Sequence, residues 1–166
     1  MRKPPEFEND SADQKKQKPH LRALRWLTRR EYSEFELRLR LGDEGYSSEE
    51  INQALAWLSN NNWQSDARFA SSLARRRAAT YGSRLIKAEL QQHQVTAPDI
   101  QHAFEDLEVS DADRAFVWLN KRTRHHAFSP ENRSKWFRAL LARGFAPDDV
   151  KKALKRCELL RTDTES

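Results

Sequence analysis

The sequence predicts an all-α protein built as an elongated array of three tandem three-helix repeats. Only 4 glycines and 6 prolines occur in 166 residues, and residues with high helix propensity dominate the chain after residue 20. No Asn-Gly or Asp-Gly pair marks a hairpin turn. A third observation, an internal repeat, sets the number of units.

The repeat is seen when residues 33–58, 82–107 and 132–157 are aligned without gaps. Several columns are apolar in all three copies: Leu37/Ile86/Trp136, Leu41/Leu90/Leu140, Tyr46/Val95/Phe145, Ile51/Ile100/Val150, Ala54/Ala103/Ala153 and Leu55/Phe104/Leu154. Such a match indicates three copies of one structural unit. Because a unit of about 50 residues buries little surface alone, neighbouring units are expected to stack into an elongated row.

Each unit is expected to contain three helices. The first helices are predicted over residues 21–30, 66–79 and 113–123. The second helices carry an apolar pair four residues apart, and Gly45 and Gly144 end two of them in the left-handed conformation that suits glycine. Gln94 holds the matching position in the second unit, so it either tolerates that conformation or the helix ends with a different cap. The third helices start with residue types suited to a helix N-terminus: Ser47, Thr96 and Pro147.

These elements divide the chain into five predicted segments. Residues 1–19 contain Met1, Phe7 and Ala12 as their only apolar residues, too few to offset the entropy of ordering, so a disordered tail is expected. The three repeats are predicted over 20–62, 63–110 and 111–161, the last of them basic. Residues 162–166 are expected to form a second, shorter tail.

Several classes of protein do not fit the composition. No stretch approaches the roughly 18 apolar residues of a membrane span, and the first residues lack the apolar core of a secretory signal. The single cysteine, Cys157, cannot form an internal disulfide, which favours a reducing, cytoplasmic location. Cys157 shares a column with Leu58 and Leu107, so we expect it in the core.

No pattern of catalytic or metal-binding residues is convincing. The five histidines are His20, His93, His102 and the adjacent pair His125 and His126, and they lack the spacing of zinc ligands. There is no glycine-rich phosphate loop and no Ser-His-Asp order worth proposing, and the paired acids at 49–50 and 148–149 are explained by helix starts. We therefore expect a protein that is not an enzyme and that uses no cofactor or metal.

The basic residues are the most informative polar feature. Residues 111–161 contain 13 Lys and Arg against 6 Asp and Glu, an excess of +7, while the whole chain carries +5. This asymmetry favours a polyanionic or acidic partner, although for any single residue a solvated helix face is the favoured explanation, by about two to one. The candidate binding face comprises Arg75, Arg76, Arg77, Arg84, Lys87, Lys121, Arg122, Arg124, Lys151, Lys152 and Lys155.

The five tryptophans raise base stacking as a second way to bind nucleic acid. Trp136 lies in the Leu37 column of the repeat, and Trp57 is next to the apolar stripe of its helix. We therefore expect most of the tryptophans to belong to the core.

The repeat and its linkers resemble a known family, the bacterial RecX regulators of the RecA recombinase. The resemblance covers about residues 21–160 and depends on short motifs in a fixed order. Residues 33–37 resemble Ser-x-x-Glu-Leu, residues 66–70 resemble Asp-x-x-Phe-Ala, and residues 82–90 resemble Gly-x-x-x-Ile-x-x-Glu-Leu. The motif residues are Ser33, Glu36, Leu37, Asp66, Phe69, Gly82, Ile86 and Leu90. Where the family usually has Lys-Gly, this chain has His93-Gln94.

The resemblance implies a regulatory protein without catalytic activity. Family members bind the filament that RecA forms on single-stranded DNA, and they depress its ATPase, strand-exchange and coprotease activities in DNA repair and the SOS response. A monomer that contacts RecA and single-stranded DNA, and no membrane, is expected on this basis. The alternative is a sequence-independent DNA-binding protein that acts without RecA, since three-helix units can mimic helix-turn-helix domains. An enzyme such as a nuclease is a third possibility, but the sequence lacks a cluster of metal ligands.

Overall fold

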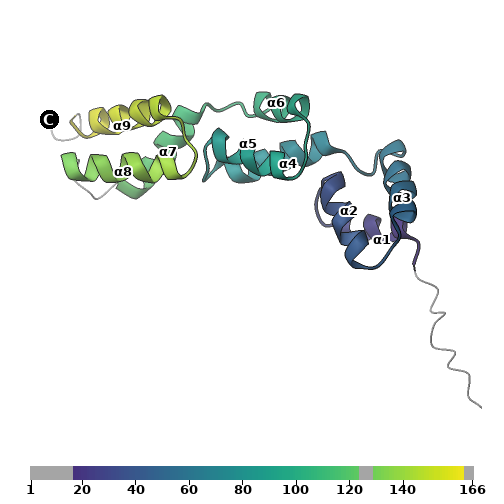
Figure 1. Ribbon diagram of the computed structural model, residues 1–166. Helices are drawn as coiled ribbons and strands as arrows, with labels where there is room; N and C mark the ends of the chain where they lie inside the picture. The colour runs from purple at the N-terminus through teal and green to yellow at the C-terminus, as the bar shows by residue number, and fades with distance from the viewer. Residues whose placement is uncertain (1–16, 124–128, 163–166) are drawn as a thin grey trace, which may run out of the picture.

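A computed structural model describes residues 17–123 and 129–162, and within these ranges the chain forms nine α-helices (Figure 1). They are α1 (Pro19–Leu27), α2 (Glu34–Asp43), α3 (Ser48–Asn60), α4 (Asp66–Ala78), α5 (Ser83–Gln92), α6 (Ala97–Glu105), α7 (Asp111–Thr123), α8 (Pro130–Ala142) and α9 (Pro147–Thr162). The all-α prediction is therefore confirmed. No helix among the described residues is long and apolar enough to cross a membrane.

The helices form three successive groups, each with a hydrophobic core of its own. We call α1–α3 the first group, α4–α6 the second group and α7–α9 the third group. The repeat explains these cores, because Leu41, Leu90 and Leu140 are fully buried in the first, second and third core respectively. Figure 1 shows an elongated chain in which the second and third groups follow one another in line, while the first group is set at an angle.

The groups do not stack in the way that the sequence suggested. We expected neighbouring units to bury apolar surface against each other, but the buried residues of each core cluster come from one group alone. The packed helix pairs, such as α4 with α6 and α7 with α9, also lie within a group. Polar side chains and backbone groups therefore make the described junctions.

The helix ends follow the predicted signals. Ser33 and Ser47 each accept a hydrogen bond from the backbone N–H three residues on, and Glu36 and Glu50 complete the two capping boxes. Gln94 does take the left-handed conformation, with φ of +58°, alongside Gly45 at +78° and Gly144 at +84°. The second group therefore closes this turn without the glycine that the other two groups use.

Three boundaries differ from the sequence expectations. The N-terminal tail was predicted to reach residue 19, but α1 begins at Pro19 and the Tyr46 hydroxyl donates to the Gln17 carbonyl at 2.6 Å. The first helix also ends at Leu27, short of residue 30, and the Thr28 hydroxyl donates to the Arg25 carbonyl just beyond it. Helix α7 starts at Asp111, two residues before the predicted residue 113. Residues 1–16 and 163–166 of the predicted tails lie outside the described residues.

The second and third groups meet through their backbones. The Gly82 N–H donates to the Arg143 carbonyl at 2.9 Å, and the Arg84 N–H donates to the Gly144 carbonyl at 3.2 Å. The C-terminal carbonyls of α8 thereby satisfy N–H groups at the start of α5, where Gly82 offers no side-chain cap. The Ser83 N–H and hydroxyl both donate to Asp111, the first residue of α7.

Arg114 of α7 is buried at the same junction and forms hydrogen bonds across it. Its side chain is 8% exposed, and it donates to the carbonyls of Ala78 and Tyr81, to the Ser83 hydroxyl and to Asp111. A buried guanidinium needs this many acceptors because an unpaired charge is costly away from water. Arg114 therefore fixes the end of α4 and the start of α5 against α7.

The first and second groups are joined through side chains. Asp66, the first residue of α4, accepts from the Glu34 N–H and from the Gln64 amide, each at 2.8 Å. Arg68 pairs with Glu31 at 2.9 Å across the same junction. Burial raises the pKa of Asp66, although both hydrogen bonds act in the opposite direction.

Candidate functional site

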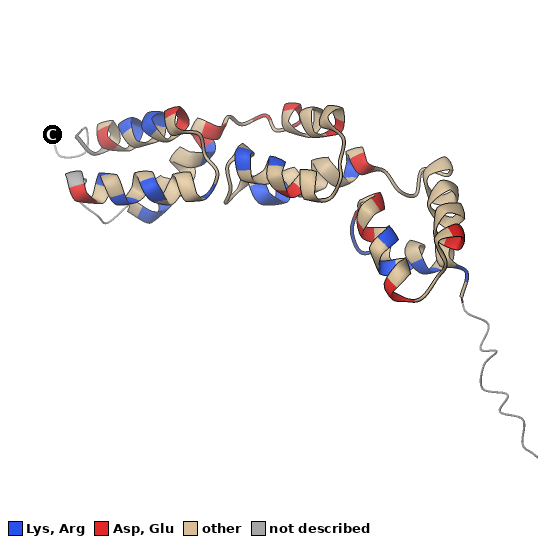
Figure 2. Cartoon of the chain, in the orientation of Figure 1, with Lys and Arg blue, Asp and Glu red and all other residues tan. Residues whose placement is uncertain are grey.

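The predicted basic residues are spread over several helices, and the structure does not gather all of them into one site. Figure 2 shows Lys and Arg on α4, α5, α8 and α9, whereas α3 and α6 carry neither. Surface grooves along the chain separate the candidates, since Arg75 and Lys121 line one, Lys87 a second and Lys151 a third. Each groove is considered below in chain order.

Arg75 and Lys121 come together across the junction of the second and third groups. They line a groove of about 560 Å³ between α4, the segment 106–109 and α7. Its apolar surface includes Val109 and Val117, which are about half exposed. The groove also contains Asp106, whose carboxylate lies 3.7 Å from the Arg75 guanidinium. The two predicted cations are thus neighbours in space although 46 positions separate them in the sequence.

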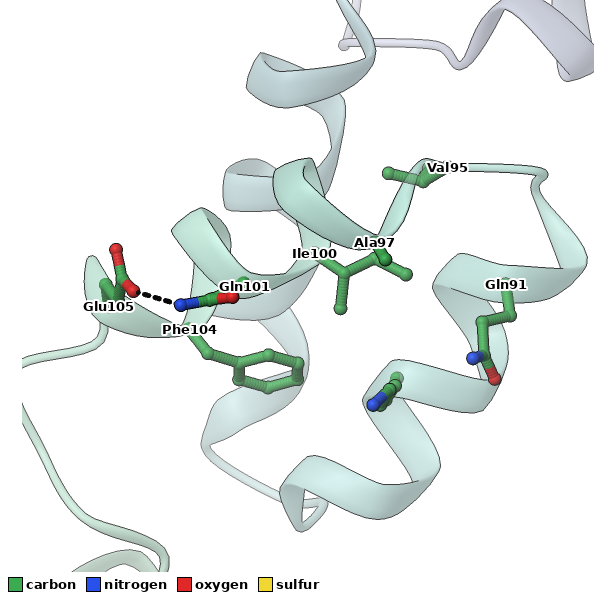
Figure 3. A pocket seen from close by; sticks show the side chains of 8 residues that line it. Gln91, Val95, Ala97, Ile100, Gln101, Phe104 and Glu105 are labelled. Atoms are coloured by element: carbon green, nitrogen blue, oxygen red, sulfur yellow. Dashed lines mark hydrogen bonds between the residues drawn. The ribbon is translucent and has the colours of Figure 1, made fainter.

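Lys87 lies in a different groove, between α5 and α6 (Figure 3). This groove has a volume of about 570 Å³ and an apolar lining that includes Ile100 and Phe104. The Gln101 amide donates to Glu105 at 2.9 Å along one side of it. Lys87 is its only basic lining residue, so this groove does not extend a positive surface.

The cations of α9 are exposed, and the first two have acidic neighbours. Lys151 lies 3.2 Å from Asp148, and Lys152 lies 3.9 Å from Asp149. Lys151 also lines a groove of about 510 Å³ with Arg133 and Arg138 of α8. The other predicted cation of this helix, Lys155, is exposed one turn after Lys151.

Arg77 differs from its neighbours in the arginine run. It binds Glu89 of α5 with both Nε and Nη2, the shortest distance being 2.7 Å, and this hydrogen bonding raises the pKa of its guanidinium. Arg77 therefore ties α4 to α5 inside the second group. Arg76 and Arg84 are exposed. Arg124 lies outside the described residues.

Arg122 is held against an aromatic ring. Its Cζ atom lies 3.9 Å from the centroid of the Trp118 ring one turn earlier on α7. Arg143, at the end of α8, places its Cζ atom 4.2 Å from the same centroid. The candidate face predicted from the sequence does not include Arg143. The contact of Arg143 with Trp118 depends on how the helices of the third group pack together, and no local sequence pattern indicates that packing.

Most of the tryptophans belong to a core or pack against one, as the sequence predicts. Trp118 is 4% exposed, and Trp26 and Trp136 are partly buried against the first and third cores. Trp57 and Trp63 are exceptions, at 40% and 55% exposed. His20 packs against the Trp57 ring with centroids 4.7 Å apart.

The motif residues of the resemblance have structural roles. Leu37, Phe69, Ile86 and Leu90 are at most 2% exposed and belong to the first two cores. Ser33 and Glu36 form a capping box, and Asp66 accepts the Glu34 N–H across the first junction. Gly82 contacts the backbone of Gly144.

Glu36 is itself held by a second partner. Arg30 forms two hydrogen bonds with its carboxylate, at 2.9 and 3.0 Å. Burial would raise the pKa of Glu36, but the hydrogen bonds and charge of Arg30 and the Ser33 N–H lower it overall. The ionised carboxylate therefore stabilises the start of α2.

Comparison with known proteins matches two family models and several relatives. Residues 21–58 match the first three-helix domain of RecX, and residues 65–103 match its second three-helix domain. The "Regulatory protein RecX" of Ralstonia pickettii (strain 12J) is 35% identical over 86% of this chain and 89% of its own length. That of Neisseria gonorrhoeae (strain ATCC 700825 / FA 1090) is 32% identical over 81% of this chain and 87% of its own length.

Solved structures show the same fold. The crystal structure of RecX from Lactobacillus salivarius aligns with a TM-score of 0.71 at 19% identity, over 86% of this chain and 96% of that one. A second crystal structure, of regulatory protein RecX, aligns with a TM-score of 0.70 at 23% identity, over 84% and 72% of the two chains. The relatives that are more than 30% identical over most of their length, together with the matches to the two RecX domains, show that the chain belongs to the RecX family of regulatory proteins.

Proposed function

We propose that this protein binds the RecA–single-stranded DNA filament as a cytoplasmic, non-enzymatic regulator. In this proposal it acts as a monomer and lowers the ATPase, strand-exchange and coprotease activities of RecA. It would thereby modulate recombination, DNA repair and the SOS response. RecA as the partner comes from the resemblance to the family, and the chemistry of the surface supports a polyanionic component of that partner.

The observation that carries the proposal is an elongated chain whose third group is rich in cations without carboxylate partners. Among the described residues, no Asp or Glu forms an ion pair with Lys121, Arg122 or Lys155. Such charges remain available to release counterions from a nucleic acid or to meet acidic side chains of a filament. An elongated row of groups also offers a long contact surface to a repeating polymer.

The proposal is tested by reversing cations of the third group in the full chain. The variant carries Lys121→Glu and Lys155→Glu, both at exposed positions without a described carboxylate partner. Exposed charges away from caps and cores change stability by about 0.5 kcal/mol or less, so the circular dichroism spectrum should be unchanged. We expect the concentration that half-inhibits DNA-dependent ATP hydrolysis by RecA to rise at least about tenfold, since each lost phosphate contact removes counterion release.

A matched control carries the same change of net charge in the first group. Arg25→Glu and Arg29→Glu alter two exposed cations there, and inhibition should stay close to that of the unchanged protein. Equal loss in both variants would mean that only net charge matters. A DNA-binding protein that acts without RecA would instead leave ATP hydrolysis unaffected at concentrations too low to coat the DNA, and this result would overturn the proposal.

A further inference from the structure

The third group contains two arginines on a single tryptophan. The Cζ atoms of Arg122 and Arg143 lie 3.9 and 4.2 Å from the centroid of the Trp118 ring. The two guanidinium groups are therefore separated by no more than the sum of these distances. Trp118 is 4% exposed and packs edge-on against Trp136, with ring centroids 6.3 Å apart. The ring that holds the two arginines is thus fixed in the core.

These two arginines lack the partners that other arginines have. Each of eight arginines in the described chain forms an ion pair with a carboxylate at 3.0 Å or less: Arg22, Arg30, Arg38, Arg68, Arg77, Arg114, Arg133 and Arg156. No described Asp or Glu lies within ion-pair distance of Arg122 or Arg143. Their protein acceptors are the carbonyls of Trp118, at 3.4 Å, and Ala139, at 2.9 Å.

The cluster around Trp118 therefore has more donors than acceptors. The Nε atom of Arg143 and the Nε1 atom of Trp118 are both buried and have no hydrogen-bond partner among the described residues. Two neighbouring cations also repel each other, a cost that the face of the indole ring offsets only in part. The ring occupies the space between the two guanidinium groups, so anions that bind at their outer edges would offset the repulsion.

We propose that Arg122 and Arg143, positioned by Trp118, form a clamp for two neighbouring phosphodiester groups of single-stranded DNA, one at each guanidinium. A guanidinium presents a planar fork of donors that matches two oxygens of one phosphate, and stacking on the ring fixes its plane in advance. Arg122 is exposed and Arg143 is half-buried, so their outer edges can reach a ligand at the surface.

The surroundings of the clamp favour a polyanion over a single carboxylate. Lys121 is exposed beside Arg122, and the Lys135 Nζ atom lies 5.5 Å from the centroid of the Trp136 ring. The positive charge thus continues beyond the two arginines on both α7 and α8. The clamp rests on the proposed function, because it gives the single-stranded DNA of the filament a specific binding site on the third group.

The test keeps the charge and removes the planar fork. In the full chain, Arg122→Lys and Arg143→Lys are combined, and binding of a fluorescein-labelled oligothymidylate is followed by fluorescence anisotropy at low salt. We expect Kd to rise by roughly fivefold or more, because an ammonium cannot reproduce the bidentate contact. The matched control is Arg138→Lys on α8, an exposed arginine that also has no described carboxylate partner, and its Kd should not change.

A second variant measures the number of phosphate contacts. Combining Arg122→Gln with Arg143→Gln should flatten the slope of log K against log salt by about 1.4, at about 0.7 per phosphate contact on a single strand. An oligonucleotide with a neutral methylphosphonate backbone should bind the unchanged protein and the variant equally. Thermal unfolding by circular dichroism provides the folding control, and Arg122→Lys alone is used if the double variant does not fold.

The outcomes separate the clamp from the proposed function. An unchanged Kd in the Lys variant, or no measurable binding of the oligonucleotide by the unchanged protein, would overturn the clamp even if RecA is inhibited. Lost inhibition of RecA with unchanged oligonucleotide binding would also overturn it, because the arginines would then contact acidic protein side chains. Weakened oligonucleotide binding in a protein that never inhibits RecA would support the clamp and refute the proposed function.

Discussion

Gly82 and Gly144 lie backbone to backbone at the junction of the second and third groups. A Cβ atom at Gly82 would be 2.4 Å from the carbonyl carbon and oxygen of Gly144, and one at Gly144 would be 2.6 Å from the Leu85 backbone nitrogen. Gly82 has φ of −78°, which any residue can adopt. Glycine is therefore needed at position 82 only because the two backbones approach closely. At position 144 glycine is needed both for this close approach and for the left-handed φ of +84°.

Gly82→Ala should destabilise this junction. The added methyl group meets backbone atoms that cannot rotate away, and overpacking of this kind costs about 1–3 kcal/mol. Hydrogen exchange should show loss of protection at the amides of Gly82 and Arg84, whose acceptors belong to the third group. Gly42→Ala is the control, because nothing lies within 4 Å of its added methyl and alanine favours a helix by up to about 1 kcal/mol. Equal effects of the two substitutions in urea unfolding would contradict this account.

Gln94→Gly should stabilise the protein. Gln94 has φ of +58°, a conformation that costs a residue with a Cβ roughly 1–2 kcal/mol, and the greater unfolded-state entropy of glycine offsets part of the gain. Asn62 has the same φ of +58°, but asparagine tolerates it better, so Asn62→Gly should gain less. Thermal unfolding compares the melting temperatures of the two variants. A larger rise for Asn62→Gly than for Gln94→Gly would show that backbone strain does not determine which variant gains more stability.

Replacing Arg114 should be among the most damaging single changes. Arg114→Met removes the cation that pairs with Asp111, which keeps only its hydrogen bonds from Ser83, and it takes a donor from the carbonyls of Ala78 and Tyr81. Loss of one partner of a buried pair costs about 3–5 kcal/mol. Arg114→Lys should recover little, because an ammonium cannot span the separated acceptors. Urea unfolding measures both variants, and full rescue by lysine would mean that charge alone matters here.

The stability conferred by Glu36 should depend on pH. Its pKa is lowered in the folded protein, so its contribution is complete above the unfolded value of about 4.3 and is lost as the pH falls through the lower, folded value. Glu36→Gln should therefore be less stable than the unchanged protein at pH 7, by about 1.5–3 kcal/mol for hydrogen bonds to a charged group. The difference should shrink in acid, as measured by urea unfolding across pH.

Asp66 provides a comparison of opposite sign. Burial raises its pKa, so its contribution is present below the unfolded value of about 3.9 and is lost as the pH rises through the folded value. Asp66→Asn keeps an acceptor for the Glu34 N–H, and its stability relative to the unchanged protein should increase from acid toward neutral pH. The same direction of change for the Glu36 and Asp66 variants would contradict the assigned shifts.

The sequence was sufficient to predict features that depend on local pattern. The columns of the repeat place Leu41, Leu90 and Leu140 in three cores, and the match of Gln94 to two glycines indicates the left-handed conformation as one of two possible helix ends, the one that the structure shows. Helix periodicity and capping residues act within a few positions of each other, so one chain segment contains the whole signal.

Features that depend on distant segments could not be predicted in this way. The column of Leu37 and Ile86 suggested a buried Trp136, but Trp136 is only partly buried. The contact of Gly82 with Gly144 and the pairing of Arg143 with Trp118 both require α8 to fold back along the chain. The sequence also cannot show which of the predicted basic residues remain unpaired. Carboxylates on other helices form ion pairs with some of them, as Glu89 of α5 does with Arg77 of α4.

The borrowed cap of α5 has a consequence for the order in which the protein is assembled. Ser33 and Ser129 cap their own helices, α2 and α8, with a hydroxyl group, whereas the first turn of α5 depends on carbonyls from a helix some 60 residues further along. While the second group alone has been synthesised, α5 has no acceptor at this end other than water. Asp111 of α7 then accepts the Ser83 N–H, but the N–H groups of Gly82 and Arg84 gain their acceptors only when α8 has folded, so the second and third groups are expected to complete this junction together.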